Sequence, residues 1–254
     1  MNAGVPPYFT SLKPFTGLFA AGTPALIYHK LGPRPRGVRL KGLYLGRPLF
    51  ERQLSELREA GFATPAYGLP PSREGNPGRS IALTFDDGFA NVIQHGLEPL
   101  ARQGFRAIEF LVADLIGLCN EWEVQEGEAR QPLMNETQIK EWLAAGHEIG
   151  SHTLTHPFLT RLSPPQAGEE ISASKKKLED RFGRPVRHFC YPYGDWNPAV
   201  RDLVMAAGYE TACTTDFGVN TGATPPFELK RILARYQSVS FKALKERLAR
   251  TRFR

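Results

Sequence analysis

Cysteine is scarce in this chain, and long apolar runs are missing. The three cysteines, Cys119, Cys190 and Cys213, are odd in number and widely spaced, which argues against a disulfide framework and against a CxxC-type zinc site. No run reaches the roughly 18 apolar residues that are needed to span a bilayer. The apolar piece at residues 17–27 is interrupted by Gly22 and Pro24, so the N-terminus does not resemble a secretory signal. We therefore expect a reduced protein in the cytoplasm.

Acidic residues are too few to balance the basic ones. The net charge is +6 at pH 7 and the pI is about 9.3, yet no nucleic-acid-binding motif accompanies this excess. Basic residues gather at residues 230–254, and residues 236–254 are predicted to contain a basic C-terminal helix. A solvated helix face is the simple interpretation, and attraction to an anionic membrane surface or an acidic polymer is the alternative. The sequence indicates no nucleic-acid partner and no particular oligomeric state.

Apolar residues make up 41% of the 254 residues, which is enough for a sizeable core, and their spacing alternates between strand and helix patterns. The expected strands are residues 25–29, 81–83, 107–112, 147–151, 186–191 and 211–214. The expected helices are residues 50–60, 91–103, 135–146, 163–182, 198–207 and 241–250. This alternation predicts a parallel α/β sheet or barrel whose site lies at the carboxyl ends of the strands.

No internal repeat or clean linker divides the chain, so residues 1–254 are expected to form one domain. Residues 1–23 show no periodicity and predict an extended arm that packs on this domain. The segment 119–134 is acidic and irregular, and it predicts a surface insertion. Asn135, with Gln138 three positions later, predicts the capped start of a helix.

Two adjacent carboxylates follow the apolar run 81–83, in the stretch Thr84-Phe85-Asp86-Asp87-Gly88. Where a strand gives way to a turn, two neighbouring side chains can both reach one cleft. Crowded carboxylates are hard to keep ionised, and a bound cation would resolve the repulsion, with one carboxylate as ligand and the other as base. Taken alone, Asp-Gly equally predicts an ordinary turn.

Two histidines lie four residues apart in the stretch Ser151-His152-Thr153-Leu154-Thr155-His156-Pro157. They would share one face of a helical turn, and the proline predicts that this helix is limited to a single turn. Two imidazoles and one aspartate suit zinc, with positions left open for water and substrate. A polar loop with incidental histidines is the alternative.

The ordered motifs TFDDG at 84–88, HTLTH at 152–156 and FCYPYG at 189–194 resemble the polysaccharide deacetylase family, the NodB-homology or carbohydrate esterase 4 group. The resemblance covers approximately residues 25–235. It implies a distorted (β/α) barrel with seven or eight strands. It also implies a divalent metal ion, with Zn²⁺ expected and Co²⁺ or Ni²⁺ as alternatives.

The resemblance implies a role for each matching residue. Asp86 would be the catalytic base, and Asp87, His152 and His156 would bind the metal ion. The backbone N–H of Tyr193 would help to form the oxyanion hole.

The chain departs from the family pattern at two places. Many members carry an arginine before Pro-Tyr-Gly, where this chain has Cys190 or Tyr191, and many carry a C-terminal Leu-x-His whose histidine is the general acid, whereas no histidine follows His188. The branch that acts on poly-N-acetylglucosamine exopolysaccharide has a similar Tyr-His near its N-terminus, in a permuted motif order. By this resemblance His29 would be the acid. The segment Leu229-Lys230-Arg231-Ile232 is similar to a late motif of that branch, so Arg231 would position the base.

Trp196 follows the last of these motifs on an expected loop at the same rim. It would be either a stacking platform for a sugar ring or a packing residue. The predicted function is metal-dependent removal of N-acetyl groups from an amino-sugar polymer or its precursor. The alternatives are an amide hydrolase or deformylase with a small or lipid-linked substrate, and a carbohydrate-binding protein without activity.

Overall fold

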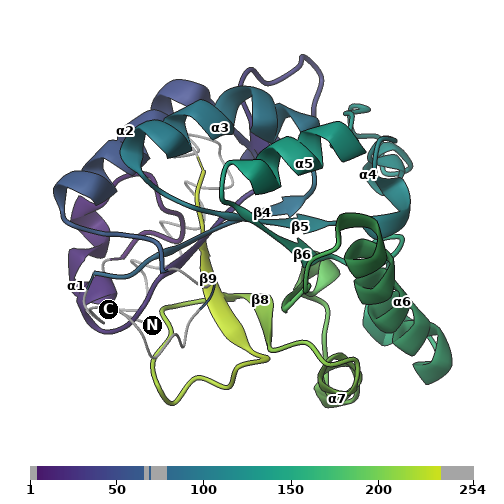
Figure 1. Ribbon diagram of the computed structural model, residues 1–254. Helices are drawn as coiled ribbons and strands as arrows, with labels where there is room; N and C mark the ends of the chain where they lie inside the picture. The colour runs from purple at the N-terminus through teal and green to yellow at the C-terminus, as the bar shows by residue number, and fades with distance from the viewer. Residues whose placement is uncertain (1–4, 66–68, 70–78, 236–254) are drawn as a thin grey trace, which may run out of the picture.

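The computed structural model describes residues 5–65, 69 and 79–235. These residues form a closed barrel of parallel strands in the order β1-β4-β5-β6-β7-β8-β9, with helices around it (Figure 1). The strands are β1 (Ala25–Tyr28), β4 (Ala82–Asp87), β5 (Ile108–Leu111), β6 (Glu148–Ser151), β7 (His188–Cys190), β8 (Thr211–Phe217) and β9 (Leu229–Leu233). The predicted (β/α) barrel is therefore confirmed.

The first strand closes the barrel by pairing with strands on both of its sides. Leu26 of β1 is in register with Leu83 of β4 and with Ile232 of β9. Strand β9 was recognised in the sequence only as a motif, and β8 is longer than the expected 211–214. Closure brings residues near both ends of the chain to the same part of the barrel.

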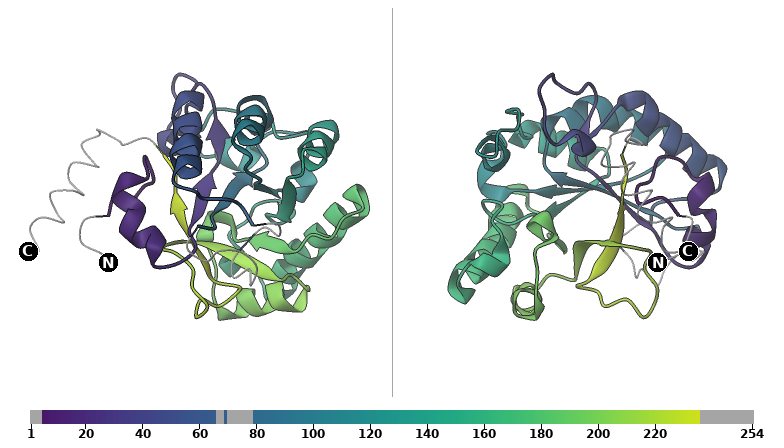
Figure 2. Two further views of the ribbon diagram at one scale, coloured as in Figure 1. Left: turned by 60° about the vertical axis from the view of Figure 1, so that its left-hand side comes forward. Right: turned by 180° about the vertical axis from the view of Figure 1, so that it is seen from behind.

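The helices pack around the barrel in two groups. Helices α2 (Arg47–Glu59), α3 (Ala90–Gln103) and α5 (Glu136–Ala144) follow one another along one flank, and α6 (Pro164–Phe182) packs on α7 (Pro198–Ala206), as Figure 2 shows from two further sides. The shorter elements are α1 (Thr16–Ala20), α4 (Glu121–Val124), β2 (Lys30–Leu31), β3 (Tyr44–Leu45), η1 (Lys13–Phe15), η2 (Lys41–Leu43), η3 (Ala113–Leu115), η4 (Leu159–Arg161) and η5 (Pro192–Gly194).

Alternation along β4 sends neighbouring side chains to opposite sides of the barrel wall. Phe85 packs towards the helices, with its ring 5.9 Å from that of Trp142 on α5. Thr84 and Asp86, one residue to either side, contact Arg231 of β9 instead. Successive strand residues point to opposite faces, so the pattern that buries Phe85 also directs Asp86 into the barrel.

Local signals explain where several helices begin. Helix α5 starts with the predicted capping box, in which the Gln138 N–H donates to Asn135 Oδ1 and the Asn135 N–H donates to Gln138 Oε1, both at 3.0 Å. Helix α6 begins at Pro164, the first helical position, where the missing N–H of proline is harmless.

Two segments differ from the sequence prediction. Residues 5–23 are not an extended arm, because residues 13–20 form η1 and α1, and Phe9, Phe15 and Phe19 are buried in the core. The segment 119–134 is not a surface insertion, since it includes α4 and the buried Glu123. In both segments a few buried side chains hold the chain in place, although their spacing follows no helix or strand period.

The predicted basic helix within residues 236–254 lies outside the described residues. Among the helices that the structure does describe, none is both long enough and apolar enough to cross a membrane.

Candidate active site

The two neighbouring aspartates at the end of β4 point to different partners. Asp87 and Gly88 both have φ of 80°, a left-handed conformation that costs a non-glycine residue about 1–2 kcal/mol. This turn directs Asp87 to the two histidines, while Asp86 stays in the strand and faces Arg231. The two carboxylates therefore lie at the end of β4, as expected, and the turn gives them different partners.

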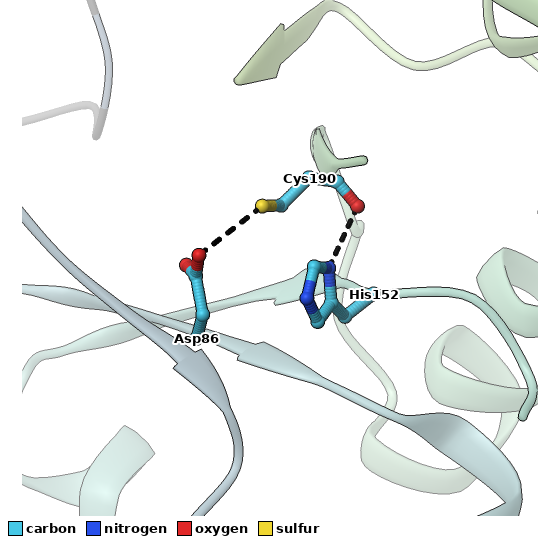
Figure 3. A group of neighbouring side chains, drawn as sticks. All are labelled: Asp86, His152 and Cys190. Carbon is cyan, nitrogen blue, oxygen red and sulfur yellow. Dashed lines mark hydrogen bonds between the residues drawn. The ribbon is translucent and has the colours of Figure 1, made fainter. Parts of the chain in front are cut away.

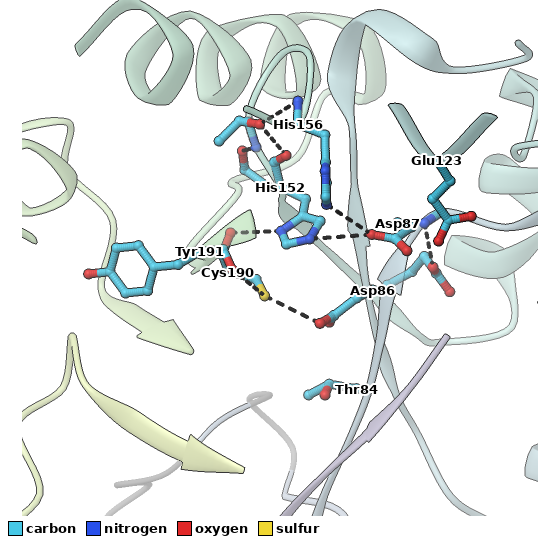
Figure 4. Close-up of polar contacts among 12 residues, drawn as sticks. Thr84, Asp86, Asp87, Glu123, His152, His156, Cys190 and Tyr191 are labelled. Carbon is cyan, nitrogen blue, oxygen red and sulfur yellow. Dashed lines mark hydrogen bonds and ion pairs between the residues drawn. The ribbon is translucent and has the colours of Figure 1, made fainter. Parts of the chain in front are cut away.

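Asp87, His152 and His156 bring three donor atoms together (Figure 4). The Asp87 Oδ1 lies 3.4 Å from His152 Nε2 and 3.3 Å from His156 Nε2, and all three side chains are buried. Two ligands that each lie about 2.1 Å from a tetrahedral zinc ion are about 3.4 Å apart. The spacing and the chemistry of these donors therefore fit a divalent cation of that size.

The His152 ring has only one orientation that satisfies its partners. Its Nδ1 lies 2.7 Å from the backbone oxygen of Cys190. A carbonyl oxygen can only accept, so Nδ1 carries a proton and donates, and Nε2 is the ring nitrogen that faces Asp87 and could bind a cation. A hydrogen bond from the second ring nitrogen to a carbonyl is the usual way in which proteins fix a metal-binding histidine.

The loop between the two histidines is not the helical turn that the sequence predicted. Thr153 and His156 have φ of 71° and 69°, and the His156 N–H donates to Thr153 Oγ1 at 3.0 Å. Glu170 of α6 accepts hydrogen bonds from the backbone N–H groups of Leu154 and Thr155, at 2.9 and 3.0 Å. Because these side chains satisfy the loop amides, the histidines converge without helical hydrogen bonds.

Arg231 binds the carboxylate of Asp86 through two parallel hydrogen bonds. Its Nη1 and Nη2 each donate to one oxygen at 2.8 Å, and its Nε donates to the Thr214 backbone oxygen at 2.9 Å. Burial raises the pKa of Asp86, but the charge and hydrogen bonds of Arg231, together with the charges of His29 and His152, hold this pKa below its ordinary value. Asp86 is thus an ionised, oriented carboxylate at neutral pH.

Cys190, two residues before Pro-Tyr-Gly, is one of the two residues found where the sequence lacked an arginine. Its thiol lies 3.5 Å from Asp86 Oδ2, and Figure 3 shows Cys190 linked to both Asp86 and His152. These three residues also place donor atoms within 4.8 Å of one another. However, Arg231 engages both Asp86 oxygens and burial raises the pKa of the Cys190 thiol to about 11. The set of Asp87 and the two histidines is therefore the better metal site.

His29 follows β1 directly and is half-buried at the same end of the barrel. Burial lowers its pKa, and the negative charges of Asp87 and Asp86 act in the opposite direction. Its Nδ1 is buried and has no hydrogen-bond partner among the described residues. His29 therefore lies within electrostatic reach of both aspartates and keeps a nitrogen that is not committed to the protein.

Helix α4 covers the candidate metal site from one side, which the sequence did not indicate. The Trp122 ring stacks on His156, with centroids 4.6 Å apart and planes at 22°. The adjacent Glu123 forms an ion pair with Lys30, at 2.5 Å between Nζ and Oε2. Asn120 donates to the same Glu123 oxygen at 2.6 Å. The sequence offered only two hints of these contacts. One is Lys30 directly after His29, and the other is Trp122 within an acidic stretch.

Tyr193 and Trp196 lie on the loop that follows β7. Tyr193 has φ of 59°, is 40% exposed, and stacks on Phe158 with ring centroids 3.9 Å apart. Its ring also meets the edge of His156 at 4.5 Å. Trp196 stacks on Tyr191 at 5.9 Å and is partly buried against the core. One ring at this rim is therefore open beside the metal site, while Trp196 is already engaged in packing.

Comparisons with known proteins find similarity to deacetylases. A family model described as polysaccharide deacetylase matches residues 73–212. YxkH of Bacillus subtilis, whose polysaccharide deacetylase name is provisional, is 26% identical over 216 residues, which cover 84% of this chain and 71% of that protein. The peptidoglycan-N-acetylglucosamine deacetylase PgdA of Listeria monocytogenes is 25% identical over 173 residues, which cover 68% of this chain and 32% of PgdA.

A solved structure agrees with these sequence matches. IcaB from Ammonifex degensii superposes with a TM-score of 0.70 at 26% identity, over 90% of this chain and 96% of IcaB. The family-model range contains the residues from Asp86 to His156, whereas His29 and Arg231 lie outside it.

Proposed function

Because the chain belongs to the polysaccharide deacetylase family of carbohydrate esterase 4 hydrolases, we propose that it removes N-acetyl groups from amino sugars of a polysaccharide or of its precursor, with the help of a divalent metal ion. One observation carries the proposal. The three donors of Asp87, His152 and His156 converge beside an aspartate that Arg231 holds in its charged form. Zn²⁺ is the expected ion, with Co²⁺ or Ni²⁺ as alternatives.

The metal site and the base would act on the two reacting partners. A cation held by Asp87 and the two histidines supplies Lewis-acid polarisation of the amide and a more acidic water. Asp86 accepts the proton of the attacking water through an oxygen lone pair that Arg231 leaves free, since each carboxylate oxygen has two. The Arg231 bonds keep this carboxylate fixed during the transfer.

The Tyr193 N–H and His29 would stabilise the charges that develop on the amide oxygen and on the leaving nitrogen. The Tyr193 N–H would donate to the amide oxygen as it becomes negative. His29 would give a proton to the departing amine, because an amide nitrogen is otherwise a poor leaving group. The products are acetate and a free amino sugar. Each of the two proton-transfer groups is expected to contribute about 10²–10⁴-fold.

Two other functions predict different results. A related amide hydrolase would accept a formamide, a small amide or a lipid-linked sugar in preference to a sugar oligomer. A carbohydrate-binding protein without activity would have no use for the ionised Asp86 and the uncommitted His29 nitrogen, so their presence favours an enzyme. Location in the cytoplasm and contact of the basic C-terminus with a membrane stay predictions.

The proposal is tested by acetate release from N-acetylglucosamine oligomers of increasing length. Activity should disappear after chelation and return with Zn²⁺, and Asp86→Asn or His29→Ala should largely abolish turnover while metal content is unchanged. A matched panel with a formamide and a small acetamide separates the substrate classes. Full turnover in the metal-free protein, or in Asp86→Asn, would refute the proposal.

A further inference from the structure

Glu109 is a buried acid that the mechanism does not use. It lies in β5 within an apolar run, opposite Phe85 of β4, and has no solvent exposure. Its neighbours Ile108 and Phe110 belong to the cluster inside the barrel, so strand alternation places Glu109 on the other face, in the apolar layer beneath the helices. A carboxyl group in such a layer needs a specific partner to offset its desolvation.

That partner is the turn that directs Asp87 to the histidines. The Gly88 N–H donates to Glu109 Oε1 at 3.0 Å, and on the other side the Gly88 oxygen accepts from the Met134 N–H at 2.7 Å. Asp87 and Gly88 are consecutive left-handed residues, and such a turn is maintained only when its surroundings hold it. Glu109, on strand β5, supplies one of the two hydrogen bonds that hold Gly88.

We propose that Glu109 is a positioning residue that holds Asp87 in its metal-binding orientation through the Gly88 N–H. The inference rests on the proposed metal site. Without the Glu109 acceptor, the Gly88 N–H is buried and unpaired, which is unfavourable. The strained Asp87 backbone can then relax, and its carboxylate leaves the positions 3.3 and 3.4 Å from the histidine nitrogens.

Only the acceptor oxygen of Glu109 is required, and its negative charge is not. Burial raises the pKa of Glu109 well above its usual value, and the charge of Asp86 raises it further. A neutral amide keeps the acceptor for the Gly88 N–H and places its NH2 group where Oε2 already lacks a partner, whereas an apolar or shorter side chain loses the acceptor. This difference separates positioning from simple filling of the core.

The test uses the full chain, with zinc affinity measured by competition with a chromophoric chelator. Glu109→Leu removes the acceptor, Glu109→Asp withdraws it by one methylene, and Glu109→Gln keeps it. The first two variants should bind zinc about 10–100-fold more weakly, as expected when an outer-shell partner of a metal ligand is lost, and Glu109→Gln should stay within about threefold of the wild type. Ile139→Val, a fully buried change in α5, is the control, because it should lower the melting temperature by a change in a helix and not in β4 or β5.

The outcomes are distinct. Wild-type zinc affinity in folded Glu109→Asp or Glu109→Leu, or equal weakening in Glu109→Gln, overturns the inference. Weaker binding in Ile139→Val as well would show that affinity follows global stability, which also overturns it. A wild-type protein that binds no zinc, cobalt or nickel refutes the proposed metal site itself, and so is distinguishable from failure of Glu109 alone.

Discussion

Removal of Lys30 should destabilise the protein strongly, and removal of its partner as well should restore about half of the loss. The Lys30 side chain is fully buried and that of Glu123 is 5% exposed, with 2.5 Å between the charged atoms. The ammonium also lies 4.4 Å from the centre of the Phe89 ring. In Lys30→Met the Glu123 charge would be buried without its counter-ion.

The magnitude follows from the desolvation of that charge. Breaking a buried ion pair on one side costs about 3–5 kcal/mol, whereas replacing both partners by apolar groups is often neutral. The double variant Lys30→Met/Glu123→Leu leaves Asn120 without its acceptor, which costs about 1–3 kcal/mol. We therefore expect Lys30→Met to lose about 4 kcal/mol and the double variant to lose about 2 kcal/mol.

The single variant should also depend on pH. Burial raises the pKa of Glu123 above its ordinary value of 4.5, and Lys30 acts to lower it, so loss of Lys30 raises it further. A carboxyl group with a raised pKa in the folded state binds more protons there than in the unfolded state, and stability falls as pH rises above about 4.5. Lys30→Met should therefore be less destabilised at pH 5 than at pH 8.

Urea unfolding followed by circular dichroism at these two pH values measures both effects. The wild type, the two single variants and the double variant complete a double-mutant cycle. Losses in the single variants that are each below about 1 kcal/mol, or that simply add in the double variant, would refute the reasoning. Either result would mean that the pair is more hydrated than its burial indicates.

Three further predictions concern single positions. Arg231→Lys, which cannot form the paired bonds to Asp86, should lower kcat at least tenfold with unchanged zinc affinity; weaker zinc binding would place Arg231 in the metal site instead. Glu170→Ala frees the amides of the loop between the histidines and should weaken zinc binding in chelator competition, whereas Glu169→Ala on the same helix should not; equal effects would contradict the role of Glu170. Burial lowers the pKa of His147 to about 4 from 6.5, so the folded state binds fewer protons and stability is lost as pH falls between these values, by about 3 kcal/mol. His147→Gln should remove that part of the acid sensitivity in urea unfolding at pH 7 and 4.5, and an unchanged pH dependence would contradict it.

The sequence predicted which strand ends would meet, because all strands of a parallel barrel present their carboxyl ends on one side. The motif at 84–88 ends strand β4, the histidines at 152 and 156 follow strand β6, and the structure brings them together. Their catalytic roles stay predictions. The helical turn between the histidines was wrong because a spacing of four residues does not distinguish a helix from a loop held by Thr153 and Glu170.

Contacts between distant segments had no comparable signal. Trp122 reaches His156, and Glu123 reaches Lys30, across stretches of chain with no shared period. An acidic and irregular composition is typical of exposed loops, so burial of Glu123 could not be predicted without knowing that Lys30 lies opposite. Arg231 was identified by resemblance, but its paired bonds to Asp86 depend on barrel closure between β1 and β9.

This closure has a consequence for the order in which the site is completed during translation. The ribosome synthesises His29 first, then the aspartates and histidines, and Arg231 only near the end of the 254 residues. A nascent chain that has emerged as far as residue 212 already contains the three metal donors, but not the guanidinium that fixes Asp86. Asp86 is therefore fixed in place only after the last strand of the barrel has joined the first.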